Sequence, residues 1–537
     1  MLKNIYICAQ NQQTKPVKKT ILSALLCLNL LAATAQDIPC TIQKSEIFKD
    51  KYRDSKLISL DEDSKGGVVV ARSFMGSVFN SDTWGYYFEH YDADMKLINE
   101  YEHFVRGFVL GTIVKDDVVT MVDFGYDKET KEFVCNANVA SLNDFKFKTT
   151  ELFRVPRKTV HTGIIFSGGG SSDSDNFAAM LTNTEKTAFA ISLDVDDKEE
   201  KKEIHNIYVY DLNLKLKIDH TFKRDIKDRK FTYENIDISQ DGNVAYLLGK
   251  ARTAENKKKK EGGRYQYELT RITNSDSKTQ VFDTDEHYAA SLILLFKKGG
   301  IACAGFYSDR NDSRFKGLCY FEVDPESLAI KKSKFNPFPE QFMIDKYGKD
   351  KDKELKDISY RDIFLTSNNE IVFNAEERYT TTTYSAYGTP GVPSGMVGGR
   401  YSVVYHFDDI VSAKLADNGD LVWARNINKR QSSGGSESFV SYSSMVKGDY
   451  TYFFINSADK VSKLSNDRIQ FNQKSAKRSN LNVIRINQNG EFDYKELLDD
   501  KDNEVPFMVS QGVATQGNSI YFLGRKGKKK QLLKLTM

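Results

Sequence analysis

The amino-acid sequence predicts an all-β protein built from repeated units, and three observations lead to this fold class. Runs rich in Val, Ile, Tyr and Phe, the residue types that favour strands, occur throughout a chain with only nine prolines in 537 residues. A strand–turn–strand pattern recurs along the chain. Its last copy lacks one strand, and an unassigned strand-like stretch near the N-terminus is available to supply that strand.

The repeated pattern is clearest between Ile410 and Trp423, where alternating apolar residues stop at Asn418-Gly419 and then resume. Asn-Gly between two such runs is a strong signal for a tight hairpin turn. The arrangement returns between Leu481 and Tyr494, around Asn489-Gly490. Five weaker copies precede these two, at residues 86–101, 138–144, 207–218, 269–276 and 319–325.

A further apolar strand precedes each copy and predicts a hairpin with it. These strands lie at residues 67–71, 118–122, 188–192, 242–248, 300–305, 370–374 and 450–455, and an eighth at 518–524 is followed only by 531–535 before the chain ends. Residues 40–48 are strand-like and could complete this last unit. A ring of four-stranded sheets has no long open edge when one terminus adds a strand to the sheet formed by the other.

The sequence therefore predicts a β-propeller of four-stranded blades closed by an N-terminal strand, and the count favours eight blades over seven. We expect a signal peptide at residues 1–35 and a single propeller domain at 36–537. The alternative is two packed all-β domains that split between Lys331 and Lys356, where a charged stretch could be a linker or a surface loop between blades.

The N-terminus has the pattern of a secretory leader. Lysines at 15, 18 and 19 precede an apolar run at 21–32, and Ala33-Thr34-Ala35 offers small residues for cleavage before Gln36. The run is short for a bilayer span, and no later segment approaches the required length. We expect export to the periplasm or the exterior, without a transmembrane segment.

The charge is nearly balanced, with 77 basic and 74 acidic residues and a formal net charge of +3. A protein with this balance has no long-range field that would attract nucleic acid, so we expect no nucleic-acid partner. The oligomeric state is not predicted.

Four cysteines follow the predicted leader, and two of them, Cys303 and Cys319, flank the turn-like residues 308–313. If these residues form one hairpin, a cross-strand disulfide is geometrically possible. Two unpaired thiols that behave as small apolar residues are the equal alternative. No Cys or His spacing matches a metal site, so no metal is predicted.

The segment Gly419-Asp-Leu-Val-Trp423 resembles the Gly-x-x-x-Trp end of the turn in quinoprotein-like propeller blades. The resemblance covers one blade in part and a second, with Tyr494 in place of Trp, more loosely. Asp417 stands closer to the glycine than the acidic residue of that pattern, and no specific family is matched. The resemblance supports the fold, whereas two tryptophans cannot supply the aromatic girdle around a quinone, so no cofactor is predicted.

Candidate ligand residues lie where the innermost strand of each blade begins, because these positions surround the mouth of the central channel. They are Arg106, Tyr233, Glu234, His287, Tyr288, Tyr360, Arg361 and Asp362. Arg forks onto carboxylates and Tyr stacks on sugar rings, so such a rim would suit a glycan or a peptide terminus. The structural alternative is an Arg–Asp pair that bridges adjacent blades.

A second candidate is the long insert at residues 379–399, which is uncharged, aromatic and rich in Gly and Pro. Its tyrosines Tyr379, Tyr384 and Tyr387 would suit a surface that contacts a partner. The alternative is an ordinary long loop lying on a neighbouring blade.

These features favour a secreted or periplasmic, non-catalytic binding scaffold that recognises a protein or a polysaccharide through long hairpins on one face. One alternative is a polysaccharide hydrolase or lyase that uses channel-mouth carboxylates such as Glu234 and Asp362. Another is a structural component of the cell envelope.

Overall fold

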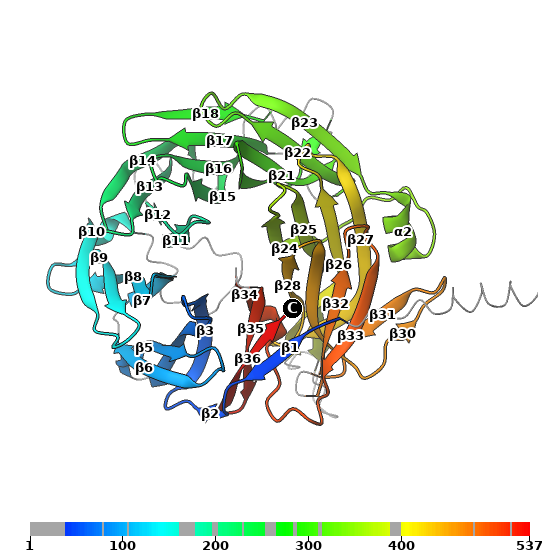
Figure 1. The fold of residues 1–537 in the computed structure, drawn as a ribbon. Helices are drawn as coiled ribbons and strands as arrows, with labels where there is room; N and C mark the ends of the chain where they lie inside the picture. The colour runs from blue at the N-terminus through cyan, green and yellow to red at the C-terminus, as the bar shows by residue number, and fades with distance from the viewer. Residues whose placement is uncertain are drawn as a thin grey trace, which may run out of the picture.

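The structure is a computed structural model that describes residues 38–77, 80–104, 107–160, 178–195, 202–227, 230–252, 265–282, 287–309, 314–386, 399–435, 437–475, 478–515 and 518–537. Within these ranges the strands form eight antiparallel sheets arranged as blades around a central axis (Figure 1). In blades 1 to 4, consecutive strands of the chain are neighbours, so each of these blades is a meander. The other blades keep this order with added strands, and the last blade takes strands from both ends of the chain. The predicted eight-bladed propeller is thus confirmed.

The first four blades follow the repeat closely. Blade 1 holds β3 (Arg53–Glu62), β4 (Val68–Ser77), β5 (Asn80–Tyr91) and β6 (Leu97–Phe104). Blade 2 holds β7 (Gly107–Lys115), β8 (Val118–Asp127), β9 (Glu132–Ser141) and β10 (Lys148–Pro156), before the turn η1 (Arg157–Thr159). Blade 3 holds β11 (Ala178–Thr182), β12 (Ala188–Asp194), β13 (Lys202–Asp211) and β14 (Leu216–Lys227). Blade 4 holds β15 (Phe231–Ile238), β16 (Ala245–Ala251), β17 (Gln266–Ile272) and β18 (Ser277–Val281).

The next three blades carry additions to the repeat. Blade 5 holds β19 (Tyr288–Ala289), β20 (Ile293–Lys297), β21 (Gly300–Ser308), β22 (Gly317–Val323) and β23 (Ile330–Pro337). Helix α2 (Glu340–Tyr347) precedes blade 6, which holds β24 (Ile358–Leu365), β25 (Ile371–Ala386), β26 (Gly399–Leu415) and β27 (Leu421–Ser433). Blade 7 holds β28 (Tyr442–Lys447), β29 (Tyr450–Ser457), β32 (Asn480–Ile486) and β33 (Phe492–Leu498). An excursion from blade 7, with β30 (Ser462–Lys463) and β31 (Ile469–Asn472), extends the outer side of blade 6, where β31 runs parallel to β27.

Blade 8 is made from both ends of the chain. The turn η6 (Val509–Gln511) leads into β34 (Val513–Ala514), β35 (Ser519–Lys526) and β36 (Lys529–Thr536). Strands β1 (Thr41–Lys44) and β2 (Phe48–Lys49) pair antiparallel with β36, and Thr41 lies opposite Thr536. The predicted N-terminal closing strand is therefore present.

A buried charge network holds this closure. Arg72 of β4 is 1% exposed and donates hydrogen bonds to Glu89 and to Asp50, with 2.7 Å between its Nη1 and an Asp50 oxygen. Lys530 of β36 lies 3.1 Å from the other Asp50 oxygen. Asp50 therefore joins the first blade to the last.

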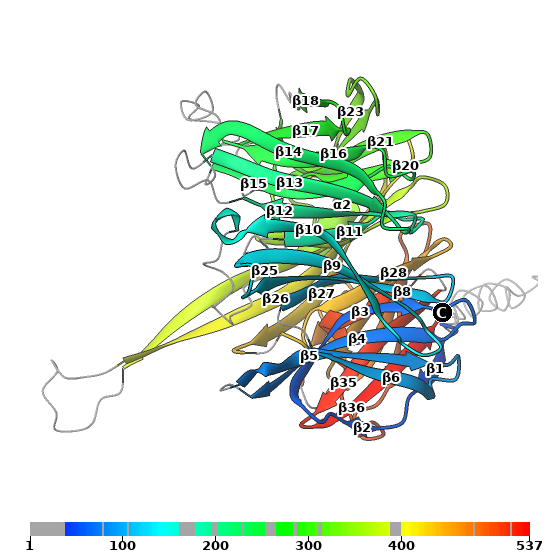
Figure 2. The same ribbon diagram turned by 90° about the vertical axis from the view of Figure 1, so that its left-hand side faces the viewer.

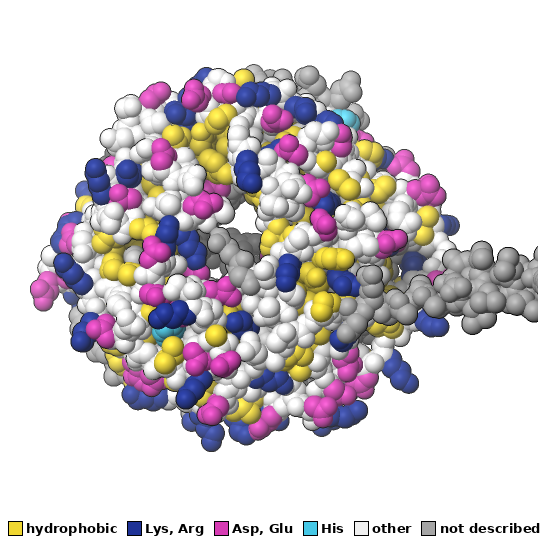
Figure 3. All heavy atoms as spheres, viewed as in Figure 1, with side chains coloured by type: hydrophobic (Ala, Val, Ile, Leu, Met, Phe, Trp, Pro, Cys, Tyr) yellow, Lys and Arg dark blue, Asp and Glu magenta, His cyan; other side chains and the backbone are white. Residues whose placement is uncertain are grey.

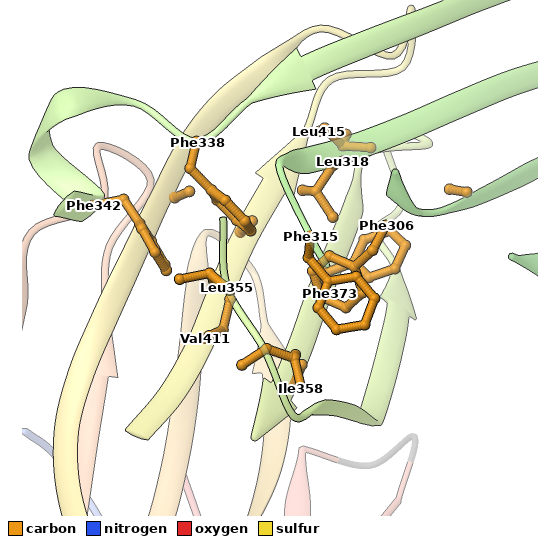
Figure 4. Packing of buried hydrophobic residues seen from close by; sticks show 14 of the residues in the cluster. Phe306, Phe315, Leu318, Phe338, Phe342, Leu355, Ile358, Phe373, Val411 and Leu415 are labelled. Atoms are coloured by element: carbon orange, nitrogen blue, oxygen red, sulfur yellow. The ribbon is translucent and has the colours of Figure 1, made fainter. Parts of the chain in front are cut away.

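Apolar side chains fill the space between neighbouring blades, so the core is a ring of inter-blade clusters. Figure 4 shows one of them between blades 5 and 6, where Phe306 of β21 and Phe373 of β25 meet. Phe342 of α2 joins the same cluster and is fully buried. Flat sheets that interdigitate in this way bury both faces of each blade.

The recurring turns contribute to the same packing. Gly419, between β26 and β27, has a φ of +84°, and a Cβ there would lie 2.2 Å from the Tyr320 ring of blade 5. Gly490 has a φ of +81°, and its Cβ would lie 3.0 Å from Trp423 of blade 6. Each turn thus rests on an aromatic residue of the preceding blade, which accounts for both glycines and for Trp423.

The charged stretch before blade 6 connects two blades, as one of the two expectations had it, and it also contains a helix. Residues 331–356 connect two adjacent blades of one ring, and they include α2, which packs on β27. Phe342 and Met343 supply the buried face of the helix, while Gly348 ends it with a φ of +75°. This stretch is therefore neither a linker between two domains nor a simple loop.

The disulfide that the sequence permits is absent from the structure, in which Cys303 and Cys319 are free, buried thiols. Cys303 of β21 lies opposite Phe321, and Cys319 of β22 lies opposite Gly305. The two cysteines are therefore diagonal neighbours rather than a directly opposed pair. Burial raises the pKa of both thiols, and the alternative of two apolar-like cysteines is the one observed.

No helix in the described part of the chain combines the length and apolar character required to cross a bilayer.

Candidate functional site

Two surfaces were candidates from the sequence: the rim formed by the inner strands and the insert in blade 6. A hollow at the centre of the ring is visible in Figure 3. The predicted rim residues lie at the beginnings of inner strands β15, β19 and β24, except Arg106, which is outside the described residues.

Tyr360 of β24 packs between blades 5 and 6. Its hydroxyl lies 2.7 Å from the Ser291 hydroxyl of blade 5, and its ring stacks on Phe306 at 5.2 Å between centroids. Burial raises the pKa of the phenol, which stays neutral. The contacts of this side chain are those of a structural residue.

Arg361 and Asp362 also connect blades. The Arg361 guanidinium donates to the carbonyl oxygens of Tyr442 (3.1 Å) in blade 7 and Ser510 (3.3 Å) in blade 8. Asp362 accepts a hydrogen bond from the Ser444 hydroxyl of blade 7, and burial raises the pKa of its carboxyl. The two residues bridge blades as the structural alternative requires, although each uses its own partner instead of forming an Arg–Asp pair.

Tyr233 and Glu234 begin the inner strand of blade 4. The Tyr233 ring lies 4.8 Å from the His205 ring of blade 3, centroid to centroid. Glu234 is exposed. Its blade is not adjacent to the blade that holds Asp362, and the hydrolase alternative that pairs these carboxyls stays a prediction.

His287 and Tyr288 belong to blade 5. His287 Nδ1 lies 2.8 Å from an Asp309 oxygen, and its ring lies 4.6 Å from the Phe335 ring. Tyr288 pairs with Ser308 in the β19–β21 ladder. These contacts occur within one blade. The ligand-binding role of the rim residues stays a prediction.

The insert in blade 6 forms a different kind of surface. Strands β25 and β26 continue past the blade as a two-stranded ribbon that projects beyond the ring (Figure 2). We call residues 379–386 and 399–406 the arm. The ladder of the arm runs from Tyr379 opposite His406 to Ala386 opposite Gly399.

Both edges of the arm lack a neighbouring strand over most of its described length. On one side, β24 pairs with β25 only as far as Glu377. On the other side, β27 pairs with β26 only as far as Tyr405. Unpaired backbone N–H and C=O groups along such edges can accept another strand.

The side chains of the arm are polar but almost uncharged. Arg400 is its single residue of the Asp, Glu, Lys or Arg type. Tyr379, Val403 and Tyr405 are 36%, 40% and 38% exposed, and Thr380, Thr381 and Thr382 are exposed as well. Natural edge strands are commonly protected by lysine, proline or bulges. The described part of the arm contains no lysine and no proline.

Tyr379 shows that the base of the arm is ordered. Its ring stacks on His406 at 4.5 Å between centroids, and its hydroxyl donates to Asp408 at 2.9 Å. Partial burial and this hydrogen bond raise the pKa of the phenol to about 12, so the hydroxyl remains a donor at neutral pH. Nothing is described of the Tyr384 side chain, and Tyr387 lies outside the described residues.

Buried ion pairs fix the root of the arm. The Lys429 ammonium and the Glu376 carboxylate are both 0% exposed and 2.8 Å apart, and Ser441 donates to the other Glu376 oxygen. Lys346 of α2 adds pairs to Glu377 and Asp409. The ladder has bulges beside Glu376 and beside Phe407, where the arm changes direction.

Sequence reasoning identified the insert but treated residues 379–399 as a loop. It missed the exposed residues of the second arm strand, Val403 and Tyr405, and the buried pair Glu376–Lys429. The signal for the second strand was available, because residues 400–407 alternate Tyr, Val and Tyr with polar or smaller positions. The buried pair had no signal, because its members are 53 residues apart.

No protein-family model matches the chain, and no curated protein matches it. The WD40 domain of SCAP from fission yeast aligns with 92% of this chain and 94% of its own, at 7% identity and a TM-score of 0.38. The β-propeller domain of the Trilobed protease from Pyrococcus furiosus aligns over 80% of this chain and 93% of its own, at 8% identity and a TM-score of 0.34. An acylaminoacyl peptidase aligns over 88% of this chain but 58% of its own, at 8% identity and a TM-score of 0.36. Similarity at this level assigns no activity or partner to the chain.

Proposed function

We propose that this protein is an exported, non-catalytic propeller scaffold that binds a partner protein through the arm. The partner would add an extended segment to an open edge of β25 or β26. The observation that carries the proposal is the arm itself, a ribbon whose edges have no neighbouring strand over most of its described length. Export is proposed from the leader-like residues 1–35.

The energetics of a two-stranded ribbon support this role. An isolated hairpin is at best marginally stable in water, because few of its side chains are buried. A third strand would supply backbone hydrogen bonds, and alternating exposed side chains such as Val403 and Tyr405 would supply specificity. A root held by the Glu376–Lys429 pair positions the arm, which lowers the entropy lost on binding.

The composition of the arm favours a protein over a charged polymer. With Arg400 as its only charged residue of the four usual types, the arm cannot form the ion pairs that hold an anionic polysaccharide. The threonines and tyrosines of the arm are residue types that favour strands, which suits the addition of a further strand.

Site-specific photo-crosslinking tests the proposal in the cells that make the protein. A photo-reactive amino acid at Val403 (40% exposed) on the arm should give a discrete cross-linked product with a second protein. The matched control is Val422 of β27, which is 47% exposed but lies on the blade. Protection of residues 399–406 from hydrogen exchange by the purified partner should then confirm strand addition.

Equal cross-linking at both positions would contradict the proposal. So would full retention of the complex after the arm is shortened. A product with twice the mass of the chain would show that the arm binds a second copy instead of a different protein.

A further inference from the structure

A cavity on the outer side of the ring lies away from both predicted surfaces. It has a volume of about 670 Å³, is open to solvent, and is lined by α2, by β27, by the segment around β31 and by the outer strand β33 of blade 7. This volume falls in the range of roughly 300–1,000 Å³ that is usual for small-ligand pockets. Figure 1 places α2, β31 and β33 together at the periphery.

Asn426 is the residue that marks the cavity as a site. It lines the cavity and is only 1% exposed. Its Nδ2 donates to Asp409 (3.1 Å) and to Asn428 (3.3 Å), which fixes the orientation of the amide. Its Oδ1 is buried and accepts no hydrogen bond from the described residues. A buried acceptor without a donor is destabilising, so a ligand whose hydroxyl donates to this oxygen would gain binding free energy.

Most of the charged groups around the cavity are already paired. Arg425 donates through Nε and Nη2 to both oxygens of Asp345. Arg468 donates to the carbonyl oxygen of Lys346 at 3.0 Å. A fourth charged side chain, Asp493, is held by Arg485, with 3.0 Å between the Arg485 Nε and one carboxylate oxygen. The fifth, Asp467, is exposed to solvent. Arg425, Asp345 and Asp493 are already in ion pairs, so a charged ligand would have to compete for them, whereas a neutral polar ligand would not.

Aromatic rings form one wall. Phe492 and Tyr494 are two residues apart on β33 and therefore point to the same face, opposite Ile486 and Ile484. Tyr494 is 41% exposed, and Phe471 contacts it edge-on at 5.3 Å between centroids. Exposed rings beside polar groups suit a ligand with one apolar face and several hydroxyls.

We propose that this cavity binds a neutral sugar. A ring of the sugar would lie against Tyr494, and one hydroxyl would donate to Asn426 Oδ1. The site is built from α2, from β27 of blade 6 and from blade 7, and none of its lining residues belongs to the arm. Sugar binding by the cavity and protein binding by the arm can therefore be tested with separate variants.

Saturation-transfer NMR with the full-length protein tests the proposal. The probes are glucose, galactose, N-acetylglucosamine, cellobiose and maltose, with glucosamine and sialic acid as charged comparators. We expect saturable binding of at least one neutral probe. Tyr494→Ala should weaken that binding by about tenfold or more, whereas Tyr494→Phe, which keeps the ring, should stay within about threefold.

Tyr405→Ala is the matched control, since Tyr405 is 38% exposed but lies on the arm, and it should leave sugar binding unchanged. Asn426→Ala, checked by thermal unfolding, should also weaken binding. The absence of saturable binding by every neutral probe would overturn the proposal, as would tighter binding of the charged comparators or native affinity in Tyr494→Ala. If Asn426 Oδ1 binds only a water molecule, no neutral probe should show saturable binding.

Discussion

Blades 6 and 8 differ in whether the edges of their strands are covered. In blade 8 the outer edge of β36 is covered by β1 and β2, and the Arg72–Asp50–Lys530 network seals the join. In blade 6 the strands β25 and β26 run past their neighbours and leave two edges uncovered. Both blades contain a buried ion pair, so burying charge does not distinguish them. The difference lies in whether backbone groups are covered, and it separates a region built for stability from one available for binding.

The largest expected effect comes from removing the closing strands. Deletion of residues 38–49 exposes the edge of β36 and removes Ile38, which is 1% exposed in the core between blades 7 and 8. The free energy of unfolding should fall by at least about 4 kcal/mol, measured by chemical denaturation. A synthetic peptide of residues 38–49 should restore stability in proportion to its concentration. A loss below about 1 kcal/mol would show that closure does not depend on these strands.

A smaller effect is expected at Asp50, whose loss leaves Arg72 and Lys530 without a shared partner. Asp50→Asn should cost about 3–5 kcal/mol at pH 7. Burial alone would raise the pKa of Asp50, but Arg72, Ser55 and Lys530 outweigh it and lower that pKa. The Asp50 contribution is therefore present above the unfolded value of about 3.9 and is lost as the pH falls through the lower folded value.

Asp237 of β15 is a carboxyl whose pKa shifts in the opposite direction from that of Asp50. Burial raises the pKa of Asp237 to about 6. Folded protein then holds a proton that unfolded protein has lost between pH ~4 and ~6, so stability falls as the pH rises through that window. Asp237→Asn should remove this slope and stabilise the protein at pH 7 by up to about 3 kcal/mol. Chemical unfolding of the unaltered protein and of each variant from pH 3 to 8 gives the contribution of each carboxyl to the free energy of unfolding. If the two contributions change with pH in the same direction, the assignment is refuted.

The smallest effect on stability is expected for the arm. Replacing residues 381–404 with Asn-Gly keeps Thr380 opposite Tyr405 and closes the ribbon with a two-residue turn. Because Thr381, Thr382 and Val403 are exposed, the free energy of unfolding should change by less than about 1 kcal/mol. Partner cross-linking should be lost. A drop as large as that for the closing strands would mean that the arm belongs to the folding core.

Much of the fold followed from local pattern. Each strand predicted from an apolar run overlaps a strand of a blade. Residues 188–192 and 450–455 lie within β12 and β29, whereas residues 242–244 lie in the turn before β16. The missing strand of the last unit led to the correct partner for residues 40–48. These predictions worked because alternation and turn residues act over a few positions, and every blade repeats them.

The candidate site was less predictable, because its properties depend on contacts between distant residues. Tyr360, Arg361 and Asp362 looked like ligand residues, but their partners Ser291, Tyr442 and Ser444 come from adjacent blades. Cys303 and Cys319 were near enough in sequence for a disulfide, yet the register places them diagonally. A one-dimensional pattern does not specify which side chains meet across an interface.

The sequence by itself determined the strands, their order and the ring, because a repeated alternation leaves each sheet with faces and edges that only its neighbours can cover. The tertiary structure alone decided where backbone and polar groups stay uncovered. It left the edges of the arm open, and it buried Asn426 with an unsatisfied oxygen beside exposed Tyr494. The physical reason is that coverage depends on every group that surrounds an atom in space, and those groups come from strands far apart in the chain.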